Sequence, residues 1–283
     1  VTTLDEEHME FYQTLENMKE TFLKFINKIP FYGSAVLCLD DPNIQSLIPR
    51  VEKRYITYGL SSQADYTARN ISIEGLKTYF NVFHHGKDLG RIRSGALGQH
   101  NVLNTLAAVA VGMELDLDFE IIANSLLQFE GVQRRFEIVK QSDELTLIDD
   151  YGHHPVEIKA SLKTVKEIWP ASRLIVIFQP HRYSRTKSLM KDFWSAFNDA
   201  DHLFVMDIFS AGESPIDKVH ASTIVEGARE CGHKNAKYIK SQNDLNKELH
   251  SLAKHGDVLM TLGAGDVWRL GRDFLVARFS QKN

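Results

Sequence analysis

Short apolar segments alternate with helical segments through the second half of this chain, from about residue 136 onward. Strand-length runs separated by helices predict βαβ units, which fold into a doubly wound α/β domain with a mainly parallel sheet. Ligands of such domains bind at the carboxyl ends of the strands, so functional side chains should follow the strands directly. We expect strands at 145–148, 173–178, 202–206, 237–239 and 257–262, and helices at 156–169, 186–199, 220–231, 243–255 and 266–279.

The first half of the chain has a different pattern. Apolar residues recur every three or four positions from Phe11 to Ile29, which predicts one amphipathic helix with these side chains on a single face. The change of pattern near Arg135 predicts two domains, residues 1–135 and 136–283. Within the first domain we also expect a strand at 34–39, a small antiparallel set at 54–60 and 66–93, and helices at 101–114 and 119–129.

The charge balance excludes some classes of partner. The chain has 33 Lys and Arg against 37 Asp and Glu, a net charge of −4, whereas a general nucleic-acid-binding protein would carry a basic excess. A small anionic ligand held by a few arginines remains compatible with this balance.

Membrane insertion is not expected, because no apolar run reaches the roughly 18–20 residues of a membrane span. Two distant cysteines cannot build a disulfide framework, so we expect a cytoplasmic protein.

The first expected strand of the α/β domain is followed by Asp149-Asp150-Tyr151-Gly152-His153-His154-Pro155. Carboxylates, a phenol and imidazoles can together bind ribose hydroxyls, a metal or an amino group. The plain structural alternative is a turn with a helix N-cap and Pro155 in the first helical turn. So many polar residues at one strand end favour a functional site.

The next strand is followed by Gln179-Pro180-His181-Arg182-Tyr183-Ser184-Arg185-Thr186. Arg182 and Arg185 are three positions apart, so they would share a face if the helix has already begun there. Such a pair could grip a carboxylate or a phosphate with paired donors. The helix dipole disfavours cations at a helix N-terminus, so an arginine pair at this place indicates an anionic ligand.

Three further segments carry candidate residues. His100-Asn101-Val102-Leu103-Asn104 opens an apolar helix. An Asn side chain has both a donor and an acceptor, which match the edge of adenine. Asn101 could equally be a helix cap. Arg134-Arg135-Phe136 lies at the domain boundary, where an arginine can reach a phosphate and a basic linker is the alternative. His8 stands in an acidic stretch and could ligate a divalent cation or be structural.

Taken in order, these segments resemble the Mur ligase superfamily, and the resemblance covers essentially the whole chain. The segments after the two strands are its most specific part. The resemblance implies that the chain consists of the C-terminal part of a central ATPase domain followed by a Rossmann-like, doubly wound C-terminal domain. An N-terminal UDP-sugar domain and the phosphate-binding loop would lie upstream. The chain contains no Walker A loop, and Val1 to Leu4 have the pattern of a strand end, so we expect a piece of a larger protein whose N-terminal region is missing.

The resemblance implies an ATP-dependent ligase that joins L-alanine to UDP-N-acetylmuramate through an acyl phosphate in peptidoglycan synthesis, with ATP and Mg²⁺ as cofactors. It assigns Mg²⁺ to His8, the adenine of ATP to His100, Asn101 and Asn104, the ATP phosphates to Arg135 and the ribose to Asp150. It assigns the alanine pocket and the reacting centre to Tyr151, His153, His181, Arg182 and Arg185. Since half of the ATP site would lie upstream, the fragment alone is expected to be inactive.

Two other functions remain open from the residues. One is a related ligase that adds a preformed murein tripeptide to the same UDP-sugar. The other is a non-catalytic module that only binds a nucleotide or an amino acid.

Overall fold

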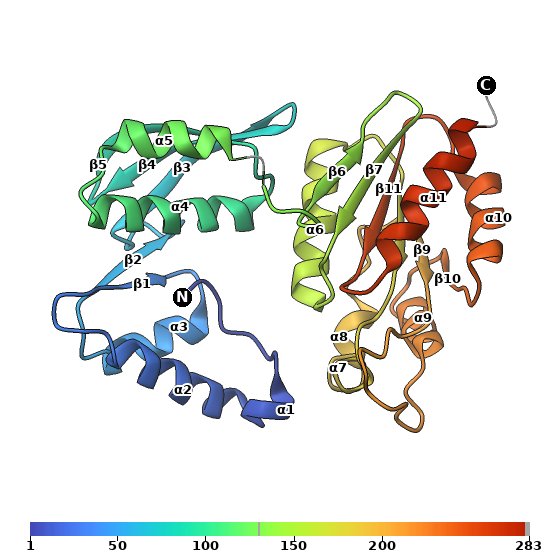
Figure 1. The fold of residues 1–283 in the computed structure, drawn as a ribbon, viewed down its shortest axis with the longest axis horizontal. Helices are drawn as coiled ribbons and strands as arrows, with labels where there is room; N and C mark the ends of the chain where they lie inside the picture. The colour runs from blue at the N-terminus through green and yellow to red at the C-terminus, as the bar shows by residue number, and fades with distance from the viewer. Residues whose placement is uncertain (130, 281–283) are drawn as a thin grey trace. The chain divides into compact units, whose positions relative to one another are not determined.

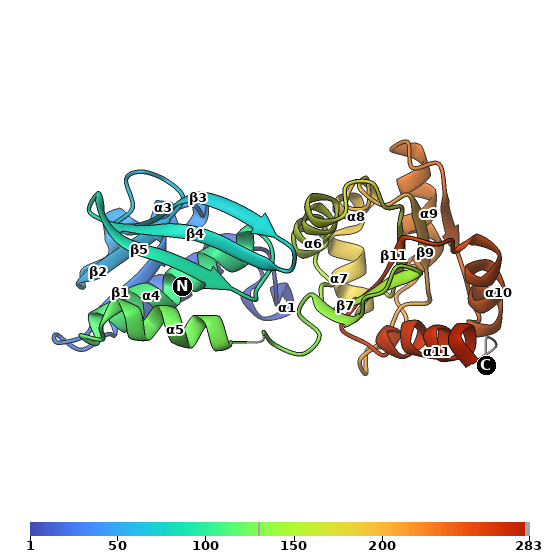
Figure 2. The ribbon, with the colours of Figure 1, turned by 90° about the horizontal axis from the view of Figure 1, so that it is seen from above.

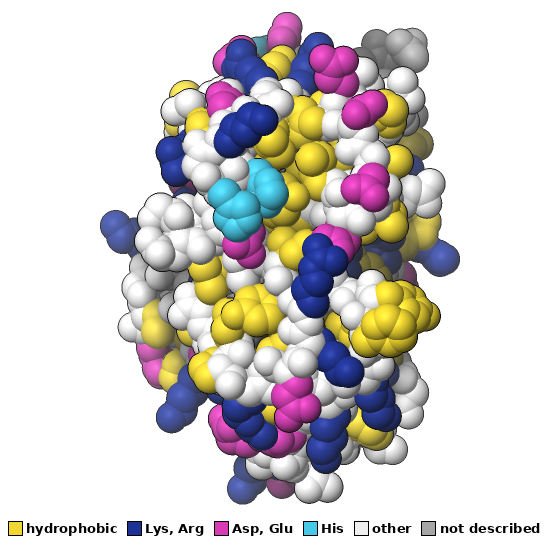
Figure 3. All heavy atoms as spheres, turned by 90° about the vertical axis from the view of Figure 1, so that its left-hand side faces the viewer, with side chains coloured by type: hydrophobic (Ala, Val, Ile, Leu, Met, Phe, Trp, Pro, Cys, Tyr) yellow, Lys and Arg dark blue, Asp and Glu magenta, His cyan; other side chains and the backbone are white. Residues whose placement is uncertain are grey.

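The computed structural model describes residues 1–129 and 131–280, and the chain divides into two compact units, Val1–Glu130 (unit 1) and Gly131–Asn283 (unit 2). Each unit contains one sheet with helices packed against it (Figure 1). In the described residues, no helix is both long enough and apolar enough to cross a membrane. On the face shown in Figure 3, basic and acidic side chains are interspersed and do not form one basic surface.

Unit 2 contains a six-stranded sheet in the order β10-β9-β8-β11-β7-β6. All neighbouring strands are parallel except β6, which is antiparallel to β7. This confirms the predicted doubly wound α/β fold. The strands are β6 (Glu137–Lys140), β7 (Leu145–Asp150), β8 (Leu174–Phe178), β9 (His202–Val205), β10 (Ala236–Tyr238) and β11 (Asp257–Leu262).

Helices cover both faces of this sheet because its central strands are apolar on both sides (Figure 2). On one face, Leu147, Ile175 and Leu259 from the sheet form a core with Leu245 of α10 and Phe274 of α11. The helices of unit 2 are α6 (Pro155–Ile168), α7 (Tyr183–Ser188), α8 (Met190–Trp194), α9 (Ala221–Glu230), α10 (Gln242–Leu252) and α11 (Val267–Ser280).

Two elements of unit 2 differ from the sequence-based expectation. The single helix expected at 186–199 is wrong, since α7 begins earlier and a break at Leu189 separates it from α8. Leu189 has φ −103° and ψ 16°, outside the helical region, and its side chain is buried, so packing fixes the break. The short edge strand β6 was not predicted, because its four residues are all half-buried and carry no clear alternation.

Unit 1 contains a five-stranded sheet in the order β1-β2-β3-β4-β5. The expected antiparallel set is correct for β3, β4 and β5 but wrong for β2, which is parallel to both β1 and β3. The chain returns through α3 (Pro42–Leu47) and a 3₁₀ turn (Ile48–Arg50) after β1, and such a crossover makes the next strand parallel. The strands are β1 (Ala35–Cys38), β2 (Tyr55–Gly59), β3 (Tyr66–Glu74), β4 (Lys77–His84) and β5 (Lys87–Ser94).

The first amphipathic helix is interrupted. Gln13 has φ +67° and ends α1 (Met9–Tyr12), and the Thr14 hydroxyl then caps α2 (Leu15–Asn27) by accepting from the N–H of Asn17. The break takes Phe11 out of the face that α2 buries, and Phe11 is 74% exposed. The expected single face is therefore wrong at Phe11. It is also wrong at Phe25, which is 66% exposed, while α2 buries Met18, Leu23 and Ile26. The remaining helices of unit 1, α4 (Gln99–Glu114) and α5 (Phe119–Gln128), confirm those expected at 101–114 and 119–129.

Candidate functional site

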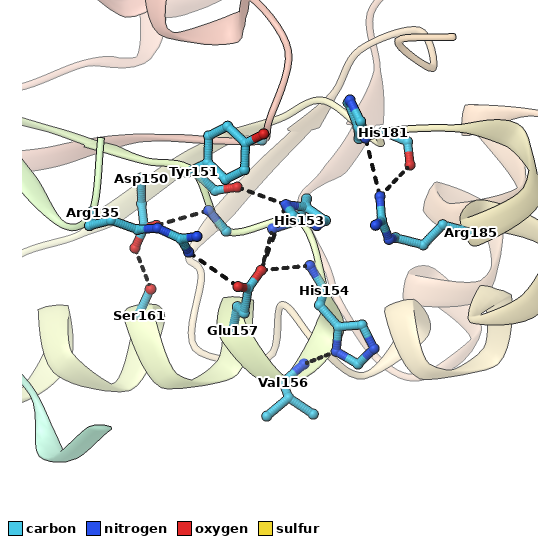
Figure 4. Close-up of polar contacts among 12 residues, drawn as sticks. Arg135, Asp150, Tyr151, His153, His154, Val156, Glu157, Ser161, His181 and Arg185 are labelled. Atoms are coloured by element: carbon cyan, nitrogen blue, oxygen red, sulfur yellow. Dashed lines mark hydrogen bonds and ion pairs between the residues drawn. The ribbon is translucent and has the colours of Figure 1, made fainter. Parts of the chain in front are cut away.

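The carboxyl end of β7 places two buried carboxylates at the edge of the sheet. Asp149 and Asp150 are the last residues of the strand, and both are almost fully buried. Asp150 accepts hydrogen bonds from the Gly152 N–H (2.8 Å) and from the Ser161 hydroxyl (2.5 Å) of α6 (Figure 4). A strand end and the first turns of the following helix thus hold Asp150 from two sides.

Burial raises the pKa of Asp150 from its ordinary value of 3.8 to about 6, although the bonds from Ser161 and Gly152 act in the opposite direction. The carboxyl group is therefore mainly ionised at neutral pH and becomes protonated in mildly acidic solution. An ionised carboxylate can accept from the hydroxyls of a ribose, whereas the protonated form accepts less well.

The raised pKa of Asp150 predicts a pH-dependent stability of unit 2. Between about pH 4 and pH 6 the folded state keeps a proton that the unfolded state has lost, so the free energy of unfolding should fall as pH rises through this window. We expect a loss of roughly 2–3 kcal/mol that is absent in Asp150→Asn. The difference between the two proteins at each pH cancels the contributions of other titrating groups. One of these is His181, whose lowered pKa makes the free energy of unfolding rise with pH. An NMR titration that places the midpoint of the Asp150 carboxyl near 4 would contradict this prediction.

His154 and Glu157 shape the start of α6. His154 is the N-cap, and its Nδ1 accepts from the Val156 N–H at 3.4 Å. The Glu157 carboxylate accepts from the backbone N–H groups of His153 (3.0 Å) and His154 (3.2 Å), which completes a capping box. The predicted cap with Pro155 in the first turn is confirmed, and it coexists with the polar cluster instead of replacing it.

Arg134 and Arg135 are held in different ways. Arg134 Nε donates to Asp149 Oδ2 at 3.1 Å, and its Nη2 donates to the Gly263 carbonyl at 2.6 Å, so this side chain is locked between β7 and the end of β11. Arg135 is half-exposed and donates from Nη1 to Glu157 Oε1 at 3.2 Å. The ring of Tyr151 lies 5.2 Å from the Arg134 guanidinium carbon and 5.1 Å from that of Arg135. These residues therefore form an ordered cluster and not a loose basic linker.

The loop after β8 brings an imidazole and a guanidinium together. Arg185 Nη1 lies 3.1 Å from His181 Nδ1 and donates to the His181 carbonyl at 3.2 Å. Because a guanidinium can only donate, Nδ1 of His181 must be the acceptor in this pair. Burial, with the neighbouring His153 and both arginines, lowers the pKa of His181 to about 4, so the ring is neutral at pH 7. The rings of His153 and His181 have centroids 5.7 Å apart, which joins the segments after β7 and β8 into one site.

The expectation that Arg182 and Arg185 share a helical face is wrong. Arg182 has φ +69° and precedes α7 as its N-cap, while Arg185 lies inside the helix. The Arg182 N–H donates to the Phe209 carbonyl, and the Arg182 carbonyl accepts from the Thr186 hydroxyl. Backbone pairing with the chain after β9 therefore fixes Arg182 in its left-handed conformation.

The candidate adenine residues lie in the first turn of α4 in unit 1. The helix begins at Gln99 with Gly98 as N-cap, so Asn101 is inside the helix and is not its cap. The Asn101 amide donates to the Leu97 carbonyl at 2.7 Å and lies 3.1 Å from His100 Nε2. Asn104 donates to Asn101 Oδ1 at 3.2 Å, which orients one amide by the other. The three polar side chains form a chain of contacts at one helix end.

His8 is exposed at the start of α1, with φ +55°, and its Nδ1 lies 3.6 Å from Glu10 Oε1. Within residues 1–129 and 131–280, no group of three or more His, Cys, Asp or Glu side chains could hold a metal ion. The described residues therefore do not assemble a complete metal site around His8.

Sequence reasoning missed two residues that organise this site. Glu157 contacts Arg135, His153 and His154, and Arg134 joins Asp149 to Gly263. The spacing of Glu157 three residues after His154 was a usable signal, because a capping box places Glu at this position. The role of Arg134 had no local signal, since its partner Gly263 is 129 residues away.

The chain belongs to the Mur ligase family, whose models match parts of both units. Its model for the Mur ligase middle domain matches residues 1–112, and its model for the Mur ligase glutamate ligase domain matches residues 134–265. A relative named UDP-N-acetylmuramate–L-alanine ligase from Desulforapulum autotrophicum is 48% identical over 97% of the chain, and another of the same name from Syntrophotalea carbinolica is 49% identical over 96%. The chain spans 60% and 59% of the lengths of these two relatives.

Solved structures agree in fold. The UDP-N-acetylmuramate–alanine ligase MurC from Thermotoga maritima superposes with a TM-score of 0.79 and 27% identity, covering 100% of this chain and 59% of that one. MurF from Acinetobacter baumannii has a TM-score of 0.78 at 16% identity, covering 97% of this chain and 58% of that one, and shares the fold alone.

Proposed function

We propose that this chain is part of an ATP-dependent ligase that joins L-alanine to UDP-N-acetylmuramate in peptidoglycan synthesis. The observation that carries the proposal is the cluster of His153, His181 and Arg185 beside Arg135 and Asp150, at the carboxyl ends of β7 and β8. The relatives named for this reaction match 96–97% of the chain. Because the proposed substrates are nucleotides, we propose that the enzyme acts in the cytoplasm.

The proposed reaction has two steps. A carboxylate oxygen of UDP-N-acetylmuramate attacks the γ-phosphorus of ATP, forming an acyl phosphate and releasing ADP. The amine nitrogen of L-alanine then attacks the acyl carbon, phosphate leaves with the bonding electrons, and the nitrogen loses a proton. The first step gathers negative charge on the phosphoryl group, and the second requires the amine close to the acyl carbon.

The residues of unit 2 suit the second step. Arg182 and Arg185 provide fixed positive charge for the alanine carboxylate, because guanidinium groups bind carboxylates with two parallel hydrogen bonds. His181 orients Arg185 through its acceptor nitrogen. Tyr151 and His153 border the same place, with the His153 Nδ1 held 3.0 Å from the Tyr151 carbonyl.

We propose a nucleotide-binding role for five of the candidate residues. In this proposal His100, Asn101 and Asn104 bind adenine, Asp150 binds the ribose, and Arg135 neutralises the phosphates. His8 is proposed as one ligand of Mg²⁺, but the described residues do not complete a metal site, so no step is assigned to the metal.

The test is an assay of phosphate release by a full-length protein that carries this sequence. We expect release to require ATP, UDP-N-acetylmuramate and L-alanine together, and the 283-residue chain alone to be inactive. A preference for a murein tripeptide over L-alanine would favour the recycling ligase and overturn the proposal. Nucleotide or amino-acid binding by the full-length protein without any turnover would favour a binding module.

A further inference from the structure

Glu157 is the one carboxylate that contacts both the candidate phosphate-binding arginine and the candidate amino-acid pocket in the described part of unit 2. Its Oε1 accepts from Arg135 Nη1 at 3.2 Å, and its Oε2 accepts from the N–H groups of His153 and His154 (Figure 4). The His153 Nδ1 lies 3.8 Å from the same Oε2. The two oxygens therefore serve two different parts of the site.

We propose that Glu157 is a positioning residue that fixes the Arg135 guanidinium relative to the His153 segment, so that phosphate binding and amine delivery are held in one geometry. This inference rests on the proposed function and extends it to a residue that touches neither substrate. A helix cap alone would need only the Oε2 contacts, and the Oε1 contact with Arg135 adds nothing to capping.

The position of Arg135 makes such support necessary. Its neighbours Arg134 and Phe136 both have left-handed backbones, with φ +59° and +52°, so the main chain at Arg135 is tightly fixed. The side chain itself is 51% exposed. An exposed arginine samples many rotamers unless a partner selects one. Glu157 and the face of Tyr151 are the contacts described for it.

The contact with Glu157 leaves Arg135 able to bind an anion. A guanidinium has five N–H donors, and one of those on Arg135 is used for Glu157. Since the Arg135 side chain makes no other hydrogen bond within residues 131–280, four of its N–H donors remain for phosphate oxygens. The carboxylate thus orients the arginine without consuming it.

The charge of Glu157 is maintained by its surroundings. Burial raises the pKa of Glu157, but His153, the two backbone N–H groups and Arg135 together outweigh this effect, and the net pKa is lowered. The side chain therefore stays ionised over the neutral range, where it can hold both partners.

Glu157→Gln separates the two roles. The amide oxygen of Gln can still accept from the N–H groups of His153 and His154, while its NH₂ group cannot accept from Arg135. In the full-length protein we expect the unfolding midpoint to fall only slightly, because the cap is kept while the charge favoured by its surroundings is lost. We also expect kcat to fall and the KM for ATP to rise, together on the order of tenfold, with the KM for L-alanine nearly unchanged. Glu157→Ala should lose the cap as well and also lower the unfolding midpoint.

Two controls decide whether Glu157 acts through Arg135. Glu167→Gln changes a glutamate of the same helix that pairs with Lys163 at 3.9 Å, and it should leave the unfolding midpoint, kcat and both KM values unchanged. The double variant Glu157→Gln/Arg135→Ala should be no worse than Arg135→Ala alone. Additive losses in the double variant, or unchanged kinetics in Glu157→Gln, would overturn the inference.

A measurement without catalysis keeps this test separate from that of the proposed function. NMR relaxation of the Arg135 side chain in the 283-residue chain should show an ordered guanidinium that becomes mobile in Glu157→Gln and not in Glu167→Gln. Equal mobility in all three proteins would refute the positioning role even if the ligase is active. An inactive full-length protein with the expected change in mobility would refute only the proposed function.

Discussion

Replacing both Arg182 and Arg185 by alanine is expected to lower kcat/KM for L-alanine on the order of 10²–10⁴-fold in a full-length protein that carries this sequence. Each hydrogen bond to a charged group contributes about 1.5–3 kcal/mol, and the two side chains are proposed to hold the same carboxylate. The KM for ATP should change little, because Asp150, Arg135 and the α4 residues are proposed to bind the nucleotide. Steady-state kinetics with varied alanine and varied ATP measure both effects.

The matched control is Lys187→Ala. Lys187 lies in the same short helix as Arg185, carries the same charge and is exposed. If its loss affects alanine as strongly as the loss of both arginines, the arginines act through general charge and not through a carboxylate site. An unchanged KM for alanine in the double variant would show that the carboxylate binds elsewhere.

Asp149→Ala is expected to destabilise unit 2 by about 3–5 kcal/mol, because it leaves the guanidinium of Arg134 without its buried carboxylate. Asp149 is 1% exposed and also accepts from the Thr261 hydroxyl at 2.7 Å, so two donors would lose their partner. Urea unfolding followed by tryptophan fluorescence reports this loss directly, because all three tryptophans, Trp169, Trp194 and Trp268, lie in unit 2.

The control for this prediction is Glu248→Ala, which removes the partner of Lys237 at 2.9 Å on the surface of the same unit. Exposed pairs contribute about 0–1 kcal/mol, so this variant should unfold almost like the wild type. A second arm, Asp149→Ala with Arg134→Met, should recover part of the lost stability by removing the unpaired charge. Equal losses in Asp149→Ala and Glu248→Ala would mean that the Arg134 pair is not an important contact.

Most of the fold of unit 2 could be predicted, because β7, β8, β9 and β11 are largely apolar runs of four to six residues and most of its helices carry a clear period. The predicted strand at 257–262 coincides with β11. The failures lie where local pattern and packing disagree. Gln13 ends α1 although the amphipathic pattern continues through it. The alternating residues of β2 indicated an antiparallel strand, but β2 follows a helical crossover and pairs in parallel with β1.

The candidate site was predicted by its segments and not by its contacts. His153 and His181 were both expected, since polar residues follow each strand, and the structure brings their rings together. Glu157 was absent from the expected site, because a Glu in the first turn of a helix is common for capping alone. Only its distance to Arg135 distinguishes it from other such residues.

The sequence by itself determined most of the strands and helices of unit 2 and which polar segments stand at strand ends, since both depend on local periodicity. The tertiary structure decided the rest, because β11 lies between β7 and β8 although it follows them by more than 75 residues. This strand order brings Gly263 to Arg134, 129 residues apart, and buries Asp149 and Asp150. Burial in turn sets the pKa of Asp150 and of His181, which no neighbouring residues in the sequence could have fixed.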